Sequence, residues 1–222
     1  MSLHEDDQVR LANLPFRSAQ TKLVSKLDEY ADHFNKIDRS FDIQSISRSS
    51  GFLARSSAVT VGSTNLFSAV HTSLRYVSTR DEPFATFLLP FLGTATFTLN
   101  RRRYRFSAGE TAVFMPGQAR QCETQLAGGT MIKLSRERLA AKAAELAGDH
   151  SDSLRFLSSF ERPWEFSTAV PIQKHLLSVI RKTVDLIDLV PDNNATLSNR
   201  LGIDDLLYRC IVLLTHPELL TP

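Results

Sequence analysis

The fold of this chain is decided by residues 87–120, which read FLLPFLGTATFTLNRRRYRFSAGETAVFMPGQAR. The stretch is typical of two paired strands, a tight turn at Gly109, a third strand and a Pro-Gly corner. Side chains alternate between the two faces of a strand. The pattern therefore predicts a small antiparallel barrel that encloses an interior.

Alternation along the first strand predicts which side chains face that interior. One row is apolar or small throughout, whereas the other row becomes polar after Leu92. The apolar row consists of Phe87, Leu89, Phe91, Gly93, Ala95, Phe97 and Leu99. Tyr104 and Phe106 are expected to point inward on the next strand. Pro90 has no N–H to donate, so the first strand is expected to lie at an edge or to carry a bulge there.

The composition is that of an ordinary soluble globular protein. The chain has 222 residues, of which 42% are hydrophobic and 23% charged, and its formal net charge is +2. So small a charge gives no reason to expect nucleic acid or an anionic membrane as a partner. No signal peptide is visible, because the N-terminus is charged, and no apolar run reaches the roughly 18 residues of a membrane span. Cys122 and Cys210 match no metal or redox spacing, and we expect free, buried thiols in a cytoplasmic protein.

Three segments follow one another along the chain. Residues 1–40 are expected to form an arm and a helix. Residues 41–134 carry short Val-, Phe-, Thr- and Ser-rich segments between Gly and Pro turns, which predicts the barrel. Residues 135–222 have helical periodicity and include a long antiparallel helix pair. The predicted class is α+β with a mainly β core, and the short connections predict one cooperative unit.

Capping residues and periodicity locate the helices. Ser18 is a candidate N-cap for the first helix. The apolar stripe of that helix consists of Leu23, Leu27, Tyr30, Phe34 and Ile37. Ser135 caps the next helix and Gly148 ends it. Pro171 begins a third helix, and the last one spans residues 199–215.

Taken together, these segments resemble the N-terminal regulatory domain of AraC-type bacterial transcription factors. The resemblance covers about residues 30–220 and rests on three stretches: GETAVFMPG at 109–117, MIKLSRERL at 131–139, and DDLL through HPELL at 204–220. It implies a cupin-like barrel that senses a small molecule or mediates dimerisation. It also implies a C-terminal pair of helix-turn-helix motifs, which is absent from this sequence. DNA binding is therefore expected only of a longer protein.

Metal and enzyme chemistry find little support in the sequence. Metal-bearing cupins present His-x-His with a downstream Glu and a later His, because imidazoles and a carboxylate hold a divalent ion in an open site. This chain has no His-x-His, and only His71 falls among the barrel strands. Just beyond the Pro-Gly corner, where such barrels often place a metal-binding His, stands Arg120. We expect neither a metal nor a cofactor.

Covalent catalysis and phosphate binding lack their usual motifs as well. There is no Gly-x-Ser-x-Gly elbow and no cysteine near a base in sequence. Gly128 and Gly129 are interpreted as a hairpin turn rather than a phosphate loop. We therefore expect no enzymatic activity, although a triad that assembles in space leaves no necessary motif.

The interior residues are the candidates for ligand binding. Aromatic walls with a few polar groups are typical of a small-molecule site, and they are equally typical of a filled core. The candidates are His71, Phe87, Phe97, Phe106 and Phe114. The identity of the effector is left open between an aromatic acid, a sugar, a fatty acid and none.

Dimerisation is predicted from the helix that begins at Pro171. Its apolar face consists of Ile172, Leu176, Ile180, Val184 and Ile187. These side chains either form a seam between two subunits or pack on the last helix of the same chain. The resemblance favours a homodimer, because paired half-sites on DNA suit a two-fold symmetric protein. The basic residues 101–105 fall at a hairpin tip, where we expect them to be solvated.

The sequence thus predicts the effector-sensing and dimerisation domain of an AraC-type DNA-binding transcriptional regulator. One alternative is a stand-alone cupin that binds or converts a small molecule. Another is a dimerisation scaffold with a filled barrel. Whether the regulator activates or represses transcription is left open.

Overall fold

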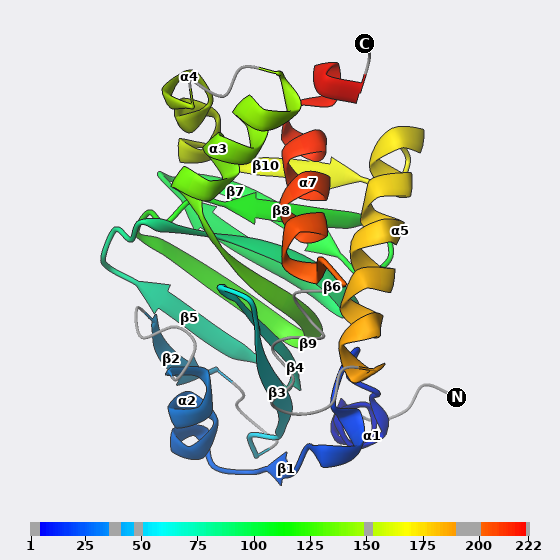
Figure 1. The fold of residues 1–222 in the computed structure, drawn as a ribbon. Helices are drawn as coiled ribbons and strands as arrows, with labels where there is room; N and C mark the ends of the chain where they lie inside the picture. Colours follow the sequence, from blue (N-terminus) through cyan, green and yellow to red (C-terminus); the bar gives the residue numbers. More distant parts are fainter. Residues whose placement is uncertain (1–4, 36–40, 47–50, 149–152, 190–200, 221–222) are drawn as a thin grey trace.

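The structure, a computed structural model, describes residues 5–35, 41–46, 51–148, 153–189 and 201–220 (Figure 1). Its strands are β1 (Leu23–Val24), β2 (Phe41–Ser45), β3 (Ala54–Val61), β4 (Thr64–His71), β5 (Leu74–Ser78), β6 (Phe84–Leu99), β7 (Arg102–Ser107), β8 (Thr111–Met115), β9 (Arg120–Ser135) and β10 (Trp164–Ser167). Its α-helices are α1 (Glu5–Leu11), α2 (Leu27–Asn35), α3 (Arg136–Leu146), α4 (Leu154–Leu157), α5 (Pro171–Asp185) and α7 (Ile203–Thr215). Short 3-10 helices are η1 (Ser18–Gln20), η2 (Ser158–Glu161), η3 (Leu186–Leu189) and η4 (Pro217–Leu220).

All ten strands belong to one antiparallel sheet. The main order is β1-β3-β4-β9-β6-β8-β10; β5 pairs with β2 and β9, and β7 pairs with β6. The first part of β9 pairs with β5, its second part pairs with β4, and β6 follows its other edge. The mainly β, α+β class is confirmed. Among the described strands, however, no ladder joins the two ends of this order, so the sheet is not closed and the predicted barrel is not confirmed.

The two faces of the sheet carry separate hydrophobic clusters. On one face, α3, α5 and α7 pack together over the sheet, and α5 and α7 run in opposite directions (Figure 1). The opposite face packs against α2. Neighbouring residues alternate between the clusters as the pleat requires: Leu66 and Ile132 belong to the helix side, whereas Phe67 and Met131 belong to the α2 side.

Paired register shifts reverse this alternation along β6 and β9. Between Pro90 and Leu92, β6 advances two residues while β9 moves by one. Between Gly93 and Ala95, β9 moves three residues for two on β6. Each strand therefore carries one extra residue. Beyond it, side chains that would have faced one side of the sheet face the other. Because both strands gain one residue, they pair in the same register before and after the shifts. The expected bulge at Pro90 is confirmed.

The reversal corrects the predicted inward row. Phe87 and Leu89 lie in the cluster beneath α3, α5 and α7. Ala95, Phe97 and Leu99, which have the same parity, lie on the α2 side. The predicted row assumes one alternation along the whole strand, and the extra residue in β6 breaks that alternation. Tyr104 and Phe106 are buried on the α2 side as expected.

A second correction concerns Gly128 and Gly129, which lie in the middle of β9 and not in a hairpin turn. A Cβ atom on Gly128 would come within 2.6 Å of the Phe91 ring. The pair therefore allows the bulged part of β6 to approach β9 closely.

The N-terminal helix begins later than predicted. Ser18 opens the 3-10 helix η1, and α2 starts at Leu27. The cause is Arg55, whose guanidinium donates hydrogen bonds to the carbonyl oxygens of Ala12, at 2.7 Å, and Ser18, at 3.0 Å. These bonds hold the incoming segment against β3, and β1 pairs with that strand. Residue Ile37 lies outside the described part of the chain.

The other helix signals are confirmed. The Ser135 hydroxyl accepts a hydrogen bond from the Arg138 N–H, at 3.2 Å, and Gly148 adopts a φ of 72°. Pro171 opens α5. The last helix, α7, begins at Ile203, and the predicted start at 199 falls outside the described residues. The arginines of the 101–105 run are exposed along the β6–β7 hairpin.

The register shifts can be tested at Gly93. This residue has a φ of 66°, and a Cβ there would lie 2.0 Å from the Leu126 carbonyl oxygen. Gly109 has a similar φ of 76° with nothing within 4 Å of its Cβ position. We expect Gly109→Ala to lower the free energy of unfolding by about 1 kcal/mol, the cost of the left-handed backbone, and Gly93→Ala to lower it by at least ~3 kcal/mol. Equal losses in urea denaturation would contradict the close approach of the two strands.

Candidate functional site

The α2 side of the sheet holds a partly open cavity of about 90 Å³. Side chains from α2, β2, β4, β5, β6, β7 and β9 line it. Several of the lining side chains are aromatic: Tyr30, Phe34, Phe41, Phe67, Tyr76, Phe97 and Phe106. The cavity is therefore a small, mainly apolar space between the sheet and the N-terminal helix.

The register shifts select the residues that face this cavity. Thr86, Leu88 and Pro90 of β6 line it before the shifts, and Ala95 and Phe97 line it afterwards. The inward set of β9 changes in the same way: Arg120, Cys122 and Thr124, followed by Ala127, Gly129 and Met131. Gly128 and Gly129 contribute backbone and no side chain, which keeps the space open opposite α2.

A chain of hydrogen bonds crosses one wall of the cavity. The Tyr30 hydroxyl lies 2.8 Å from the Tyr76 hydroxyl, which lies 2.9 Å from Nε2 of His71. Nδ1 of His71 lies 2.8 Å from the backbone oxygen of Thr72. All three side chains are buried. The chain joins α2 to β4 and β5 through polar groups inside an otherwise apolar region.

The chemistry of the groups fixes the direction of these bonds. A carbonyl oxygen only accepts, so Nδ1 of His71 carries the proton and donates to Thr72. Nε2 of a neutral imidazole then accepts, and the Tyr76 hydroxyl must donate to it. The Tyr76 oxygen accepts in turn from the Tyr30 hydroxyl. Every proton in the chain is thereby assigned, and the Tyr30 oxygen is its terminal acceptor.

Burial keeps all three side chains neutral. It lowers the pKa of His71 to about 4, although the hydrogen bond to Thr72 acts in the opposite direction. It raises the pKa of both Tyr30 and Tyr76 above the usual range. At neutral pH the cavity therefore presents an uncharged imidazole and two uncharged phenols.

Arg120 brings the one positive charge among the described residues that line the cavity. Its Nη1 atom donates to the backbone oxygen of Pro116, at 3.0 Å, and its Nη2 atom donates to the Thr86 hydroxyl, also at 3.0 Å. The guanidinium carbon lies 4.9 Å from the centre of the Phe41 ring. The residue at the position of the usual metal-binding His thus anchors the Pro-Gly corner to the cavity wall.

The structure brings together three of the five predicted ligand-binding residues. His71, Phe97 and Phe106 line the cavity, and the rings of Phe97 and Phe106 stack with centres 5.4 Å apart. Phe87 and Phe114 lie on the opposite face of the sheet in the helix-side cluster. A shared interior for all four phenylalanines is therefore not observed, because β6 changes parity between Phe87 and Phe97.

Sequence reasoning did not select Tyr30, Phe34, Tyr76 or Arg120. Tyr30 carried a signal, because a tyrosine on the apolar stripe of a helix must find a hydrogen-bond partner for its hydroxyl when it is buried. Tyr76 carried another, because it lies five residues after His71 across a short turn. Neither signal identifies a cavity without knowledge of where α2 docks.

No described group of three or more His, Cys, Asp or Glu side chains could hold a metal ion. Cys122 lines the cavity and Cys210 lies in the helix-side cluster, and both are free and buried as expected. Burial raises the pKa of the Cys122 thiol, so it is protonated and unreactive at neutral pH. Within the described ranges, no helix is both long enough and apolar enough to cross a membrane.

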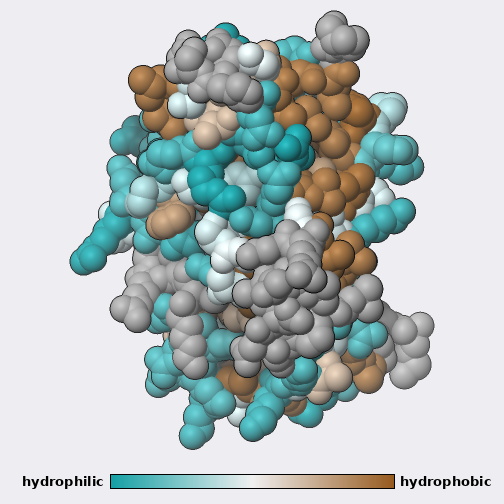
Figure 2. All heavy atoms as spheres, viewed as in Figure 1, coloured by the Kyte–Doolittle hydropathy of each residue, from teal (hydrophilic) through white to brown (hydrophobic). Residues whose placement is uncertain are grey.

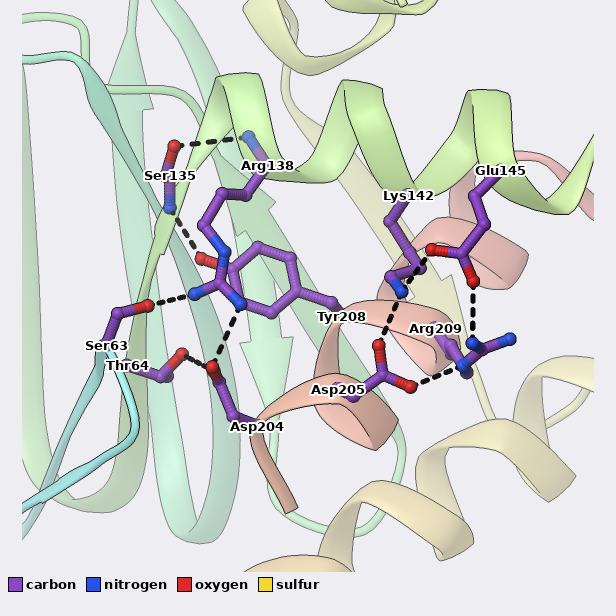
Figure 3. A network of polar contacts seen from close by, with 10 residues as sticks. All are labelled: Ser63, Thr64, Ser135, Arg138, Lys142, Glu145, Asp204, Asp205, Tyr208 and Arg209. Carbon is purple, nitrogen blue, oxygen red and sulfur yellow. Dashed lines mark hydrogen bonds and ion pairs between the residues drawn. The ribbon is translucent and has the colours of Figure 1, made fainter. Parts of the chain in front are cut away.

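A polar cluster connects the far end of the sheet to α3 and α7 (Figure 3). Asp204, at the start of α7, accepts hydrogen bonds from the Thr64 hydroxyl and from Nη2 of Arg138, the latter at 2.9 Å. The Arg138 guanidinium lies 4.2 Å from the centre of the Tyr208 ring, and the Tyr208 oxygen accepts from the Ser135 N–H at 2.9 Å. The first turn of α7 is thereby fixed to the β3–β4 turn and to the end of β9.

A second set of ion pairs continues along the same two helices. Asp205 of α7 pairs with Lys142 of α3, at 2.5 Å, and with Arg209, also at 2.5 Å. Glu145 of α3 pairs with Arg209 at 2.7 Å. Pairs as exposed as these each contribute only about 0–1 kcal/mol. Their main effect is to fix the orientation of α7 against α3.

The predicted dimerisation residues are mostly covered by their own chain. Leu176, Ile180, Val184 and Ile187 are buried in the helix-side cluster that also contains α7, and Ile172 is 42% exposed. Four of the five predicted dimerisation residues therefore pack within their own chain, as the alternative prediction stated.

The pH dependence of folding stability tests whether His71 is neutral and buried in this hydrogen-bond chain. An unfolded histidine has a pKa of about 6.5, so between pH 6.5 and 4 the unfolded chain binds a proton that folded His71 excludes. Folded-state stability is therefore complete above pH 6.5 and falls as the pH drops towards 4, by about 3 kcal/mol from this residue. Denaturant unfolding at several pH values should show this loss in the wild type relative to His71→Gln. Parallel pH curves for the two proteins would contradict a neutral, buried imidazole.

The sequence matches no protein-family model and no curated protein. Its fold is similar to that of the AraC-like transcriptional activator CuxR, with a TM-score of 0.59 and 14% identity over 88% of this chain and 69% of that chain. A cupin domain of an XRE family transcriptional regulator from Enterobacter cloacae covers 43% of this chain and 96% of its own, at 9% identity and a TM-score of 0.29. KdgF from Halomonas sp. covers 45% of this chain and 90% of its own, at 12% identity and a TM-score of 0.31. The chain therefore shares its fold, helices included, with an AraC-like transcriptional activator.

Proposed function

We propose that this chain is the effector-sensing and dimerisation domain of an AraC-type DNA-binding transcriptional regulator. The observation that carries the proposal is the likeness in fold to CuxR over 88% of the chain, which includes the helices as well as the sheet. A fold alone supports many functions, so the proposal also rests on three features of this chain: its cavity, its polar cluster and its exposed helix faces.

The cavity supplies the sensing site. Its aromatic wall and its few polar groups suit a small organic molecule. Because α2 closes the cavity on one side, a bound molecule would contact both the N-terminal segment and the sheet. Its binding would favour the arrangement of α2 and the strands that fits it best.

Two strands run from the cavity to the helices. His71, which lines the cavity, ends β4, and Thr64, which bonds to Asp204 of α7, begins the same strand. Arg120 begins β9, and Ser135, which caps α3, ends it. A shift of either strand at the cavity would therefore act on the orientation of α7 through direct contacts. In the longer protein we expect this helix to lead towards the DNA-binding domain.

The exposed faces of α5 and α7 supply the dimer interface. Apolar atoms gather over α7 and its border with α5 (Figure 2). On α5, Ile172 and Leu186 are exposed and the half-buried Val179 lies between them, each seven residues from the next; on α7, the exposed Leu206 and the half-buried Leu213 have the same spacing. A repeat of seven is typical of a seam between helices. We propose that a second copy of this chain covers these stripes across a two-fold axis.

The dimer can be tested with Ile172→Glu combined with Leu206→Glu. Both side chains are at least 36% exposed, so we expect the thermal unfolding temperature to change little. Light scattering at micromolar concentration should give twice the chain mass of 24.9 kDa for the wild type and a single chain mass for the double variant. Leu154→Glu, on α4 and 77% exposed, is the matched control and should stay dimeric. A monomeric wild type would contradict the interface.

A further inference from the structure

We infer that the cavity selects a small, neutral aromatic molecule that carries a hydroxyl or amine hydrogen, of the size and chemistry of a phenol. The hydrogen donates to the oxygen of Tyr30. This inference rests on the proposed sensing role of the cavity and gives that role a ligand class.

The size and the wall of the cavity favour one planar ring. Its volume of about 90 Å³ is smaller than the roughly 150 Å³ of an apolar cavity that binds benzene, so it leaves room for no more than one small ring. Phe34 and Phe67 meet edge to face with ring centres 5.0 Å apart, and Phe97 and Phe106, which also line the cavity, stack on each other. Such rings pack a flat aromatic ligand in offset or edge-on contacts. A sugar would bring several hydroxyl groups into a wall that has few partners for them.

The hydrogen-bond chain decides what the polar group of the ligand must be. His71 and Tyr76 use their protons inside the chain, and Tyr30 uses its own to donate to Tyr76. Among the described residues, no donor reaches the Tyr30 oxygen; Tyr30 is one of the residues that line the cavity, and its oxygen retains acceptor capacity. A ligand that donates one hydrogen bond completes the chain, whereas a ligand that only accepts would face an oxygen with no proton to offer.

The same chain argues against a carboxylate. An anion beside the Tyr30 oxygen would meet lone pairs, and its burial among phenylalanine rings carries a large desolvation cost. Arg120 is the alternative anchor for an anion. Its Nη1 and Nη2 atoms already donate to Pro116, Gln118 and Thr86, which directs the guanidinium towards the Pro-Gly corner.

Three probes of matched shape test the inference: phenol, its isostere toluene, and benzoate. Binding is followed by NMR titration of the whole chain. We expect phenol to bind the wild type about five- to tenfold more tightly than toluene, the net value of one buried hydrogen bond, and benzoate to bind most weakly. Toluene binding as tight as that of phenol would overturn the role of Tyr30. Tightest binding of benzoate would show that Arg120 anchors the ligand and would overturn the inference as well.

Variants locate the interaction. Tyr30→Phe should reduce phenol to the affinity of toluene, and unchanged toluene binding shows that the cavity is intact in this variant. Tyr104→Phe, a buried tyrosine of β7 outside the cavity wall, is the matched control and should retain the preference. Ala69→Leu fills the cavity and should abolish binding of all probes.

Phenol binding that survives Ala69→Leu, or the absence of binding by any probe, would overturn the proposed ligand class. Neither result bears on the dimer mass or on the DNA-binding role. The proposed function would still be tested by light scattering and by the sequence of the native gene. Binding of toluene or benzoate at least as tight as that of phenol, if Ala69→Leu abolishes it, would overturn the ligand class and leave the sensing role standing.

Discussion

The paired register shifts between β6 and β9 are the constraint on which the rest of this structure depends. One extra residue in each strand lets a single sheet supply two different apolar surfaces along its length. Before the shifts, Phe87 and Leu89 support the helices; after them, Phe97 and Leu99 face α2. The close approach of the strands requires Gly93 in the left-handed region and Gly128 beside the Phe91 ring. Without the extra residue in β6, Phe97 would share a face with Phe87 and would be lost from the cavity wall.

The cavity and the helices are linked by short chains of contacts. β4 has His71 at one end and Thr64 at the other, and Asp204 of α7 bonds directly to Thr64. The buried bonds around His71 are few but costly to break, because each leaves a polar group without a partner in an apolar region. The ion pairs of α3 and α7 are exposed and individually weak. We therefore expect a ligand to act by changing which strand position is preferred, while the ion pairs set the direction in which α7 moves.

Much of the fold could be predicted from local chemistry. The cap at Ser135, the helix start at Pro171, the inward Tyr104 and Phe106 and the bulge at Pro90 all follow from short patterns, and the structure confirms them. The failures have a common cause in long-range packing. A single alternation could not reveal the parity change in β6, and periodicity could not show that Arg55 holds residues before Leu27 extended. The cavity could be predicted only in part, since Tyr30 reaches it from a helix whose docking no local pattern specifies.

The central claim, that this chain is the sensing half of a DNA-binding regulator, is tested most directly by reading the native gene past the codon for Pro222. We predict an open reading frame that continues into two helix-turn-helix patterns within a short distance of α7. A stop codon at that point would contradict the DNA-binding role, and it would favour a stand-alone protein that binds or converts the molecule in its cavity.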